Sequence, residues 1–217
     1  MSERKNVTQF ICIEGGEGVG KSSLISGLQS HLESCGKEVV VTRQPGGTDL
    51  SERIREVFLE DLDLHAYSEL NLLLADRAHH LKLVVKPALD QGKIVICDRY
   101  HMSSFVYQGM LGGLPSEQIT KMIEAMYESM SSGSNYYPDL YLLLDCPVEV
   151  SEERLKKRSI QNHEITRFDA KNKSFHEQLR SSYLEVSKQM ENVKIIDARK
   201  HQQAVLQDAI QALSGVL

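Results

Sequence analysis

The chain has 217 residues, of which 41% are hydrophobic and 25% are charged, and its formal net charge is −5. This length and composition are those of one globular domain spanning residues 1–217, and they exclude a disordered, collagen-like or coiled-coil protein. An acidic chain has no overall basic footprint for nucleic acid, so we predict no nucleic-acid partner. Any anionic ligand must therefore be held by local positive charge.

Neither export nor a membrane location is expected. No signal-type apolar stretch follows the first residues, and no apolar run is long enough to span a bilayer. The four cysteines lie far apart without a C-x-x-C pair, and three of them fall in apolar runs typical of buried strands. We therefore predict a cytoplasmic protein with reduced thiols and no membrane partner.

Short apolar runs rich in Val, Ile and Leu alternate along the chain with longer segments of helical periodicity. The short runs predict strands buried on both faces: Phe10 to Ile13, Glu38 to Thr42, Ile94 to Cys97, Leu140 to Leu144 and Val193 to Ile196. The longer segments predict helices: Lys21 to Ser34, Ser51 to Leu59, Ser68 to Asp90, Ser116 to Ser131, Pro147 to Arg158, Ala170 to Met190 and Gln202 to Leu213.

This alternation predicts an α/β fold in which helices flank a five-stranded parallel sheet, in three layers. In an open parallel sheet, ligands bind beyond the carboxyl ends of the strands. We therefore expect the loops that start at Glu14, Arg43, Asp98 and Asp145 to converge on one site.

The first strand runs into a glycine-rich loop that matches G-x-x-x-x-G-K-[ST], and a helical pattern follows at once. Such a loop turns its backbone N–H groups around phosphates, its lysine reaches the β- and γ-phosphates, and its serine ligates Mg²⁺. The alternative is a glycine-rich turn before a surface helix, but every fixed position and both flanks of the motif are present. The loop predicts a P-loop NTPase fold that binds Mg·NTP through Gly15, Gly16, Glu17, Gly18, Val19, Gly20, Lys21, Ser22 and Ser23.

Asp98 and Arg99 directly follow the third predicted strand. A carboxylate at this place can hold Mg²⁺ through water, so Asp98 joins Ser22 as a predicted metal ligand. Arg99 is a candidate clamp for a second phosphate. The alternative is an Asp–Arg ion pair that only caps the strand.

A GTPase switch would use the same phosphate loop and would need D-x-x-G and N-K-x-D elements downstream. Neither pattern occurs, and the nearest match, Asn172 to Phe175, has Phe where the guanine-reading carboxylate should stand. A phosphotransferase is therefore favoured over a nucleotide switch.

Four further segments occur in one order along the chain: Thr42 to Thr48 (T-R-Q-P-G-G-T), Asp98 to Gly109 (D-R-Y-H-M-S-S-F-V-Y-Q-G), Pro138 to Asp145, and Ile196 to Ala198. Together with the phosphate loop they resemble the bacterial thymidylate kinases, a family of P-loop nucleoside-monophosphate kinases. The resemblance implies transfer of the γ-phosphoryl group of ATP to the 5′-phosphate of dTMP, with Mg²⁺ as cofactor, in a homodimer. A kinase for another monophosphate, such as dUMP, is the alternative, because Leu73 and Gln44 depart from the family pattern.

The resemblance also implies roles for particular side chains. Arg55 and Arg99 would hold the acceptor phosphate, Glu17 would lie near the sugar, and Tyr107 would pack against the deoxyribose. The base would be covered by Leu73, where the family usually has an aromatic residue, and read by Arg77, Ser104 and Gln108. For Arg55 and Arg77 the alternative is an exposed arginine on a helix. The eight histidines show no metal-ligand spacing, so surface or packing roles are expected for them.

A short mobile lid is expected over about residues 156–168, where this family carries its lid. Because Glu17 is the acidic residue in the phosphate loop, the resemblance implies that a lid arginine contacts the transferring phosphoryl group. We predict Arg158 in this role, so the expected catalytic residues are Lys21, Arg99 and Arg158. The alternative is that Lys156, Lys157 and Arg158 form a solvated face paired with Glu152 and Glu153.

Overall fold

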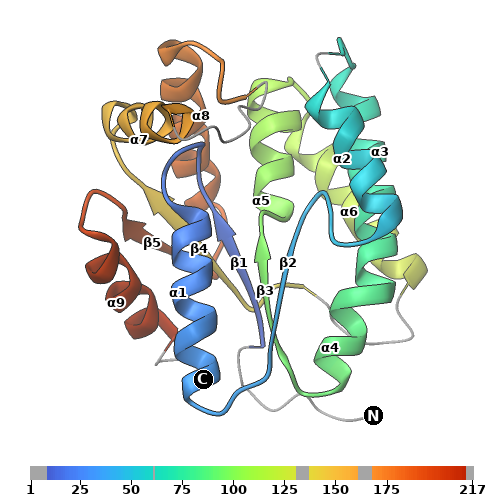
Figure 1. Cartoon of the computed structure of the whole chain (residues 1–217). Coiled ribbons are helices and arrows are strands. Elements are labelled where there is room, and N and C mark those ends of the chain that lie inside the picture. The colour runs from blue at the N-terminus through green and yellow to red at the C-terminus, as the bar shows by residue number, and fades with distance from the viewer. Residues whose placement is uncertain (1–8, 61, 131–136, 161–167, 214–217) are drawn as a thin grey trace.

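The computed structural model describes residues 9–60, 62–130, 137–160 and 168–213, and at 158–160 it describes the backbone alone. Five strands form a parallel sheet in the order β2-β3-β1-β4-β5 (Figure 1). They are β1 (Phe10–Glu14), β2 (Val39–Arg43), β3 (Ile94–Asp98), β4 (Leu140–Asp145) and β5 (Val193–Asp197). All five predicted strands are confirmed, and each ends one residue later than predicted.

Helices cover both faces of the sheet, which confirms the three layers. Helices α1 (Lys21–Ser34) and α9 (Gln202–Leu213) lie side by side on one face (Figure 1). Within β1, Ile11 and Ile13 pack toward these two helices, whereas Phe10 and Cys12 pack toward the opposite layer. Strands that are apolar on both faces are what the continuous Val, Ile and Leu runs predict.

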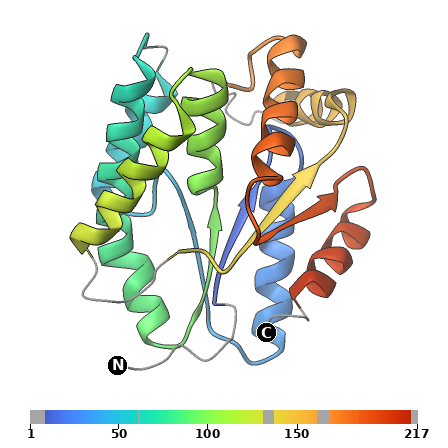
Figure 2. The ribbon, with the colours of Figure 1, turned by 180° about the vertical axis from the view of Figure 1, so that it is seen from behind.

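The opposite layer contains most of the remaining helices (Figure 2). Its members are α3 (Ala66–His80), η1 (Leu81–Val85), α4 (Lys86–Asp90), α5 (His101–Ser104), η2 (Phe105–Leu111), α6 (Ser116–Met130) and α8 (Lys173–Ser187). Helix α2 (Asp49–Leu59) packs on α3, and α7 (Val148–Ile160) passes beside the phosphate loop, where Ser151 and Leu155 lie close to Gly18.

Two helical predictions need correction. The single helix expected from Ser68 to Asp90 begins at Ala66, capped by His65, and is interrupted by the π-helix η1. Pro87 explains part of this break, because it has no N–H to donate to the preceding turn. The segment His101–Leu111 was not predicted to be helical, and it forms α5 and the π-helix η2. A π-turn does not have the 3.6-residue period on which the helix prediction rests.

All four cysteine thiols are free, and only Cys35 is exposed. Cys12 and Cys97 lie opposite each other on β1 and β3, and burial raises the pKa of both thiols. They are therefore protonated and unreactive at neutral pH. Within the described residues, no helix combines the length and the apolar character that crossing a membrane requires.

Candidate active site

A cavity of about 740 Å³ opens at the carboxyl edge of the sheet, where the loops after β1, β2 and β3 converge as predicted. The loop after β4 instead borders a separate cavity of about 20 Å³, and the Asp145 carboxylate there is held by Arg180 at 2.7 and 2.9 Å. Gly16 also lines this smaller cavity. The predicted site residues that line the main cavity are Glu17, Gly18, Val19, Gly20, Lys21, Ser22, Ser23, Arg55, Leu73, Arg77, Asp98, Arg99, Ser104, Tyr107 and Gln108.

The phosphate loop has the backbone that its glycines predict. Gly15, Gly18 and Gly20 all have positive φ, in the region that favours glycine. At Gly18 a Cβ atom would lie 2.6 Å from the carbonyl oxygen of Ser151, so no larger residue fits without movement of α7. Gly20 caps α1 without a side chain, so the first N–H groups of this helix are left for a ligand.

Lys21 is the first residue of α1 and is buried. Its ammonium group donates hydrogen bonds to the carbonyl oxygens of Gly15 at 3.2 Å and Gly16 at 2.9 Å. Burial, and then the nearby Arg99, lower the pKa of Lys21, while Glu17 and Asp98 oppose this. The ammonium is thus held against the loop, at the edge of the cavity where phosphates would bind.

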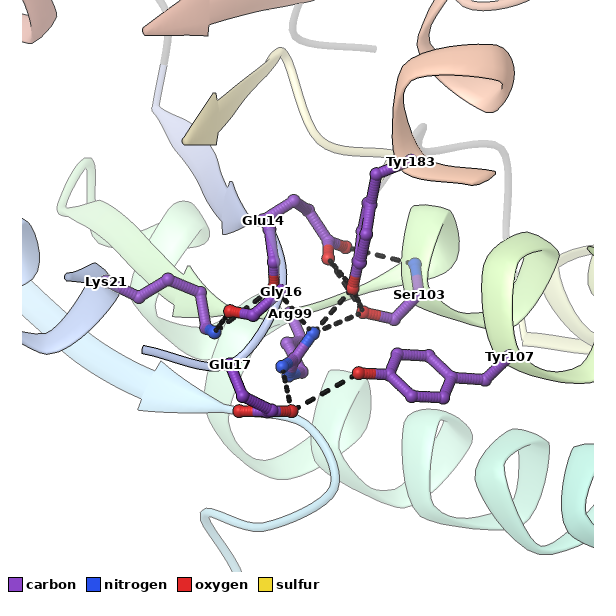
Figure 3. A network of polar contacts seen from close by, with 9 residues as sticks. Glu14, Gly16, Glu17, Lys21, Arg99, Ser103, Tyr107 and Tyr183 are labelled. Atoms are coloured by element: carbon purple, nitrogen blue, oxygen red, sulfur yellow. Dashed lines mark hydrogen bonds and ion pairs between the residues drawn. The ribbon is translucent and has the colours of Figure 1, made fainter. Parts of the chain in front are cut away.

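Arg99 joins the phosphate loop to Tyr183 of α8 (Figure 3). Its Nη2 lies 2.6 Å from a carboxylate oxygen of Glu17, and its Nη1 donates to the carbonyl oxygen of Gly15 at 3.0 Å and to the Tyr183 hydroxyl at 2.5 Å. Burial alone would raise the pKa of Glu17, but Arg99 and Lys21 outweigh burial and lower that pKa to about 2. Glu17 also accepts a hydrogen bond from Tyr107 at 3.2 Å.

The backbone of Arg99 is in the left-handed region, with φ of 68°. This conformation costs a residue with a Cβ about 1–3 kcal/mol and persists only where the surroundings impose it. Glu14 is a large part of these surroundings, since its fully buried carboxylate accepts from the Tyr100 N–H at 2.7 Å and the Ser103 hydroxyl at 2.7 Å. Glu14 therefore fixes the start of α5 and, with it, the turn that presents Arg99.

Arg77 and Gln108 are buried in the wall that faces the phosphate loop, although arginine on a helix is normally exposed. The Nε of Arg77 donates to the Gln44 side-chain oxygen at 2.9 Å, and its Nη2 donates to the Ser104 hydroxyl at 3.1 Å. The amide nitrogen of Gln108 donates to Glu69 at 2.9 Å. Arg77 Nη1 and Gln108 Oε1 are both buried without a hydrogen-bond partner in the described part of the chain.

Arg55 reaches the same cavity from α2 and donates to the carbonyl oxygen of Pro45 at 3.1 Å. Leu73 packs with Ile54 and Phe58 from α2, and both Leu73 and Phe58 line the cavity. The site thus has one wall rich in backbone N–H groups and another that carries Arg55, Arg77, Arg99 and an apolar surface.

Known proteins resemble this chain in sequence and in structure. The family model for thymidylate kinase matches residues 13–209. The chain belongs to the thymidylate kinase family. The thymidylate kinase of Chlamydia abortus is 40% identical over 194 residues, which are 88% of each chain, and that of Pseudomonas putida is 36% identical over 211 residues, 96% of each chain. The crystal structure of thymidylate kinase from Ehrlichia chaffeensis has a TM-score of 0.73 and 26% identity, with 96% of this chain and 99% of that chain covered.

Asp98 has the position and, among the described residues, the free carboxylate oxygen that a cation ligand needs. It ends β3 beside the phosphate loop, opposite Ile13 in register, and it lines the main cavity. One of its carboxylate oxygens, Oδ1, is buried without a partner in the described chain. The described residues contain no group of three or more acidic, His or Cys side chains that could bind a metal by themselves. The donors present therefore fit a magnesium ion that is completed by phosphates and water.

Several residues of the site carry no recognisable signal in the sequence. Arg154 of α7 donates to the carbonyl oxygens of Val19 at 3.1 Å and Ala198 at 2.8 Å, and it lines the cavity. Tyr183 of α8 holds Arg99, and the ring of Phe168 lies 5.3 Å from that of Tyr107. Each of these side chains sits in or beside a segment that reads as an ordinary amphipathic helix, so no local signal marked it.

Asp76 lies beneath the loop after β2 and provides a test of stability that is independent of catalysis. Its carboxylate is fully buried, and Ser51 and the Gly46 backbone face it without completing a hydrogen bond. Burial raises its pKa to about 6, although Ser51 and Arg77 oppose the shift. A group whose pKa is raised on folding binds its proton more tightly in the folded state, so its contribution to stability is present below pH 4 and is lost as the pH rises through 6.

We therefore expect Asp76→Asn to raise the free energy of unfolding by about 3 kcal/mol at pH 7.5 and by only about 1 kcal/mol at pH 4.5. Urea unfolding of both proteins at the two pH values measures this difference. The exposed Asp90→Asn, which loses only a surface ion pair with Lys86, serves as control. A variant that is less stable than the parent at pH 7.5 would show that the carboxylate is needed where it is.

Proposed function

We propose that the chain catalyses transfer of the γ-phosphoryl group of ATP to the 5′-phosphate of dTMP, which gives dTDP and ADP. The observation that most supports this is that a phosphate loop and a buried, hydrogen-bonding wall border the same cavity. Membership of the thymidylate kinase family supports this reaction over a nucleotide switch or a kinase for another monophosphate.

The phosphate side of the site can perform the transfer without a general base. The acceptor phosphate has a second pKa of about 6, so one of its oxygens is already a nucleophile at neutral pH. That oxygen forms a bond to the γ-phosphorus while the bond from the γ-phosphorus to the β,γ-bridging oxygen breaks, and ADP leaves with the electron pair. What the protein must supply is in-line placement and positive charge, which Lys21, Arg55 and Arg99 provide from three elements around the cavity.

The Ser22 hydroxyl and the Asp98 carboxylate are the proposed magnesium ligands, the latter through water. The ion would neutralise charge on the β- and γ-phosphates. Ser22 lies at the start of α1 and lines the cavity with Asp98.

The base side of the site suits thymine and disfavours cytosine. Among the described residues, Arg77 Nη1 is a donor without a partner and Gln108 Oε1 an acceptor without one, and both are buried in the cavity wall. Thymine offers the complementary pair, an acceptor carbonyl at C4 and a donor N–H at N3, whereas cytosine offers a donor at C4 and an acceptor at N3. An unpaired buried polar group costs about 1–3 kcal/mol, so the wrong base leaves both protein groups unsatisfied.

An acceptor panel tests the proposal directly. With ATP and Mg²⁺ at pH 7.5, release of ADP should depend on the acceptor, and kcat/KM for dTMP should exceed that for dCMP by about 10³-fold or more. The rate with dUMP should lie closer to that with dTMP, since uracil has the same hydrogen-bonding edge. Acceptor-independent hydrolysis of nucleotide would support a switch, and equal rates with dTMP, dCMP and dGMP would refute recognition of thymine.

Arg158 is proposed to contact the transferring phosphoryl group. The backbone of α7 carries it to within one turn of Arg154 at the cavity, while its own side chain lies outside the described residues. We expect Arg158→Ala to lower kcat about 30-fold with less than a threefold change in the KM for dTMP, because its contact forms only in the transition state. Lys157→Ala is the matched control, because Lys157 pairs with Glu153 on the exposed face as the alternative reading predicts. Unchanged kcat in Arg158→Ala would assign the role to another lid residue.

Three predictions from the sequence stay predictions: a single domain, a homodimer and a cytoplasmic location. The mobile lid over about residues 156–168 also stays a prediction. Residues 161–167 lie outside the described chain, and only 156–160 and 168 of the expected range are described.

Tyr107 is proposed to pack on the deoxyribose, with its hydroxyl held by Glu17.

A further inference from the structure

Five buried side chains form a continuous chain of hydrogen bonds beneath the base side of the cavity. Thr42 Oγ1 lies 2.6 Å from His80 Nε2, and His80 Nδ1 lies 3.2 Å from the side-chain nitrogen of Gln44. The oxygen of Gln44 then accepts from Arg77, which in turn donates to Ser104. All five side chains are at most 8% exposed. This chain of hydrogen bonds joins β2, the loop after it, α3 and α5.

The direction of every hydrogen bond in this chain follows from Arg77. A guanidinium group can only donate, so the atom of Gln44 that meets it must be the oxygen. The amide nitrogen of Gln44 must then donate to His80 Nδ1, which therefore carries no proton. Consequently His80 is neutral with its proton on Nε2, and it donates to Thr42. Burial, and then Arg77, lower the pKa of His80 to about 4, which agrees with a neutral imidazole at pH 7.

The same chain determines which nitrogen of Arg77 is left over. Nε is held by Gln44 and Nη2 by Ser104, while Nη1 has no partner in the described chain. The guanidinium also lies 4.9 Å from the centre of the Tyr100 ring, which restricts its tilt. A planar group that is held at two corners and on one face presents its third corner in a single direction.

Gly47 ties this chain to the loop that carries Pro45. A Cβ at Gly47 would lie 2.5 Å from Thr42 Oγ1 and 3.1 Å from the His80 ring, so the loop backbone rests directly on the Thr42–His80 pair. Pro45, two residues earlier, holds Arg55 through its carbonyl oxygen. A shift of His80 would therefore change both the base side and the phosphate side of the acceptor site.

We propose that Thr42, His80 and Gln44 are positioning residues for base recognition, acting through Arg77, and that Gln44 and the Nε2–H tautomer of His80 are a matched pair. The inference rests on the proposed role of Arg77 toward the thymine carbonyl. It also gives a structural role to Gln44, where the family pattern has glutamate. A carboxylate at this position has no N–H to donate, so His80 would need its proton on Nδ1, and Thr42 would have to become the donor to Nε2.

The tautomer gives a test that does not depend on activity. Long-range ¹H–¹⁵N correlation spectra of the folded protein at pH 7.5 should show His80 with its proton on Nε2. In Gln44→Glu the proton should move to Nδ1, or both nitrogens should be protonated. An Nδ1–H tautomer in the parent protein would overturn the assignment, and so would an unchanged tautomer in Gln44→Glu.

Kinetics test the positioning role. His80→Phe removes the acceptor for Gln44, and we expect it to raise the KM for dTMP about tenfold, with kcat and the KM for ATP changed less than threefold, and to reduce the preference for dTMP over dCMP. His80→Asn should restore values within threefold of the parent, because the Asn oxygen can stand where Nδ1 stands. His79→Asn, on the neighbouring residue that does not line the cavity, is the control.

The outcomes separate the two proposals. If the parent protein does not prefer dTMP, the proposed function fails before the variants are examined. If it does, and folded His80→Phe keeps the parent KM and preference, the positioning role is wrong. A variant in which the KM for ATP rises as much as that for dTMP would show general damage to the site and would equally refute the role. Should His80→Phe not fold, the comparison of Gln44→Glu with the parent in the same assays replaces it.

Discussion

Replacing Lys21 with methionine is expected to lower kcat/KM by about 10³–10⁴-fold, equivalent to about 4–5.5 kcal/mol of transition-state stabilisation. Lys21 opens α1 at the edge of the cavity, where Gly20 caps the helix without using the free N–H groups. Its ammonium is the cation of the phosphate loop itself, and negative charge moves onto the β,γ-bridging oxygen as ADP leaves. Methionine keeps most of the apolar stem of lysine and removes the ammonium, with its charge and its hydrogen bonds to Gly15 and Gly16.

The same substitution should leave stability unchanged or slightly higher, which separates loss of chemistry from loss of fold. Burial disfavours the charged form of Lys21 and lowers its pKa, so removing the charge removes a desolvation cost. Lys37→Met, at an exposed position just beyond α1, is the matched control. Single-turnover rates with saturating dTMP, together with thermal unfolding of both variants, measure the two effects. A Lys21→Met enzyme within tenfold of the parent rate would show that the loop N–H groups and the magnesium ion carry the charge alone.

The features that could be predicted from the sequence are those set by residues close together along the chain. The strands are continuous apolar runs, and the phosphate loop is fixed by consecutive glycines, so both could be found from neighbouring residues alone. Helix boundaries failed where backbone chemistry is not periodic, at the π-turns that begin at Leu81 and Phe105. A search for a 3.6-residue period cannot find a turn that has a different period.

The parts of the site that could not be predicted are those made by distant partners. Arg99 was found because it follows a strand, but its partner Tyr183 comes from a helix 84 positions later in the chain. Gln44 could be recognised only as a departure from the family pattern. Its consequence depends on His80, 36 positions away, because the amide nitrogen of Gln44 can donate only to an Nδ1 that carries no proton. His80 itself was expected to have a surface or packing role, because nothing in its neighbourhood in the sequence marks it.

Arg99 carries the second large prediction: Arg99→Lys should lower kcat/KM for dTMP by about 10³-fold, or about 4 kcal/mol. Lysine keeps the positive charge but lacks the planar guanidinium group with its two terminal nitrogens. The two terminal nitrogens of Arg99 meet Glu17 on one side and Gly15 and Tyr183 on the other, and a single ammonium group cannot reach both sides. Arg199→Lys, at an exposed arginine that pairs with Asp197, should leave the rate unchanged.

Because Arg99 pairs with Glu17, replacing Arg99 changes stability as well as catalysis, and the two effects must be measured separately. The lowered pKa of Glu17 means that its carboxylate favours the folded state above about pH 4.5, and this contribution is lost as the pH falls through about 2. Arg99→Met removes the main partner of that carboxylate, so at pH 7.5 we expect a loss of stability of about 3 kcal/mol, which a second change, Glu17→Gln, should largely recover.

Activity should not return with stability in the double variant, because the guanidinium that would hold the acceptor phosphate is still absent. Urea unfolding measures the stability, and single-turnover experiments measure the rate, of the parent, Arg99→Met, Glu17→Gln and the double variant. These four proteins form a double-mutant cycle. If Arg99→Met with Glu17→Gln were as active as Glu17→Gln alone, Arg99 would serve only to neutralise Glu17. The ion pair is absent from both the double variant and Glu17→Gln. If the double variant is the less active of the two, the lost activity assigns to Arg99 a contact with the reacting phosphates.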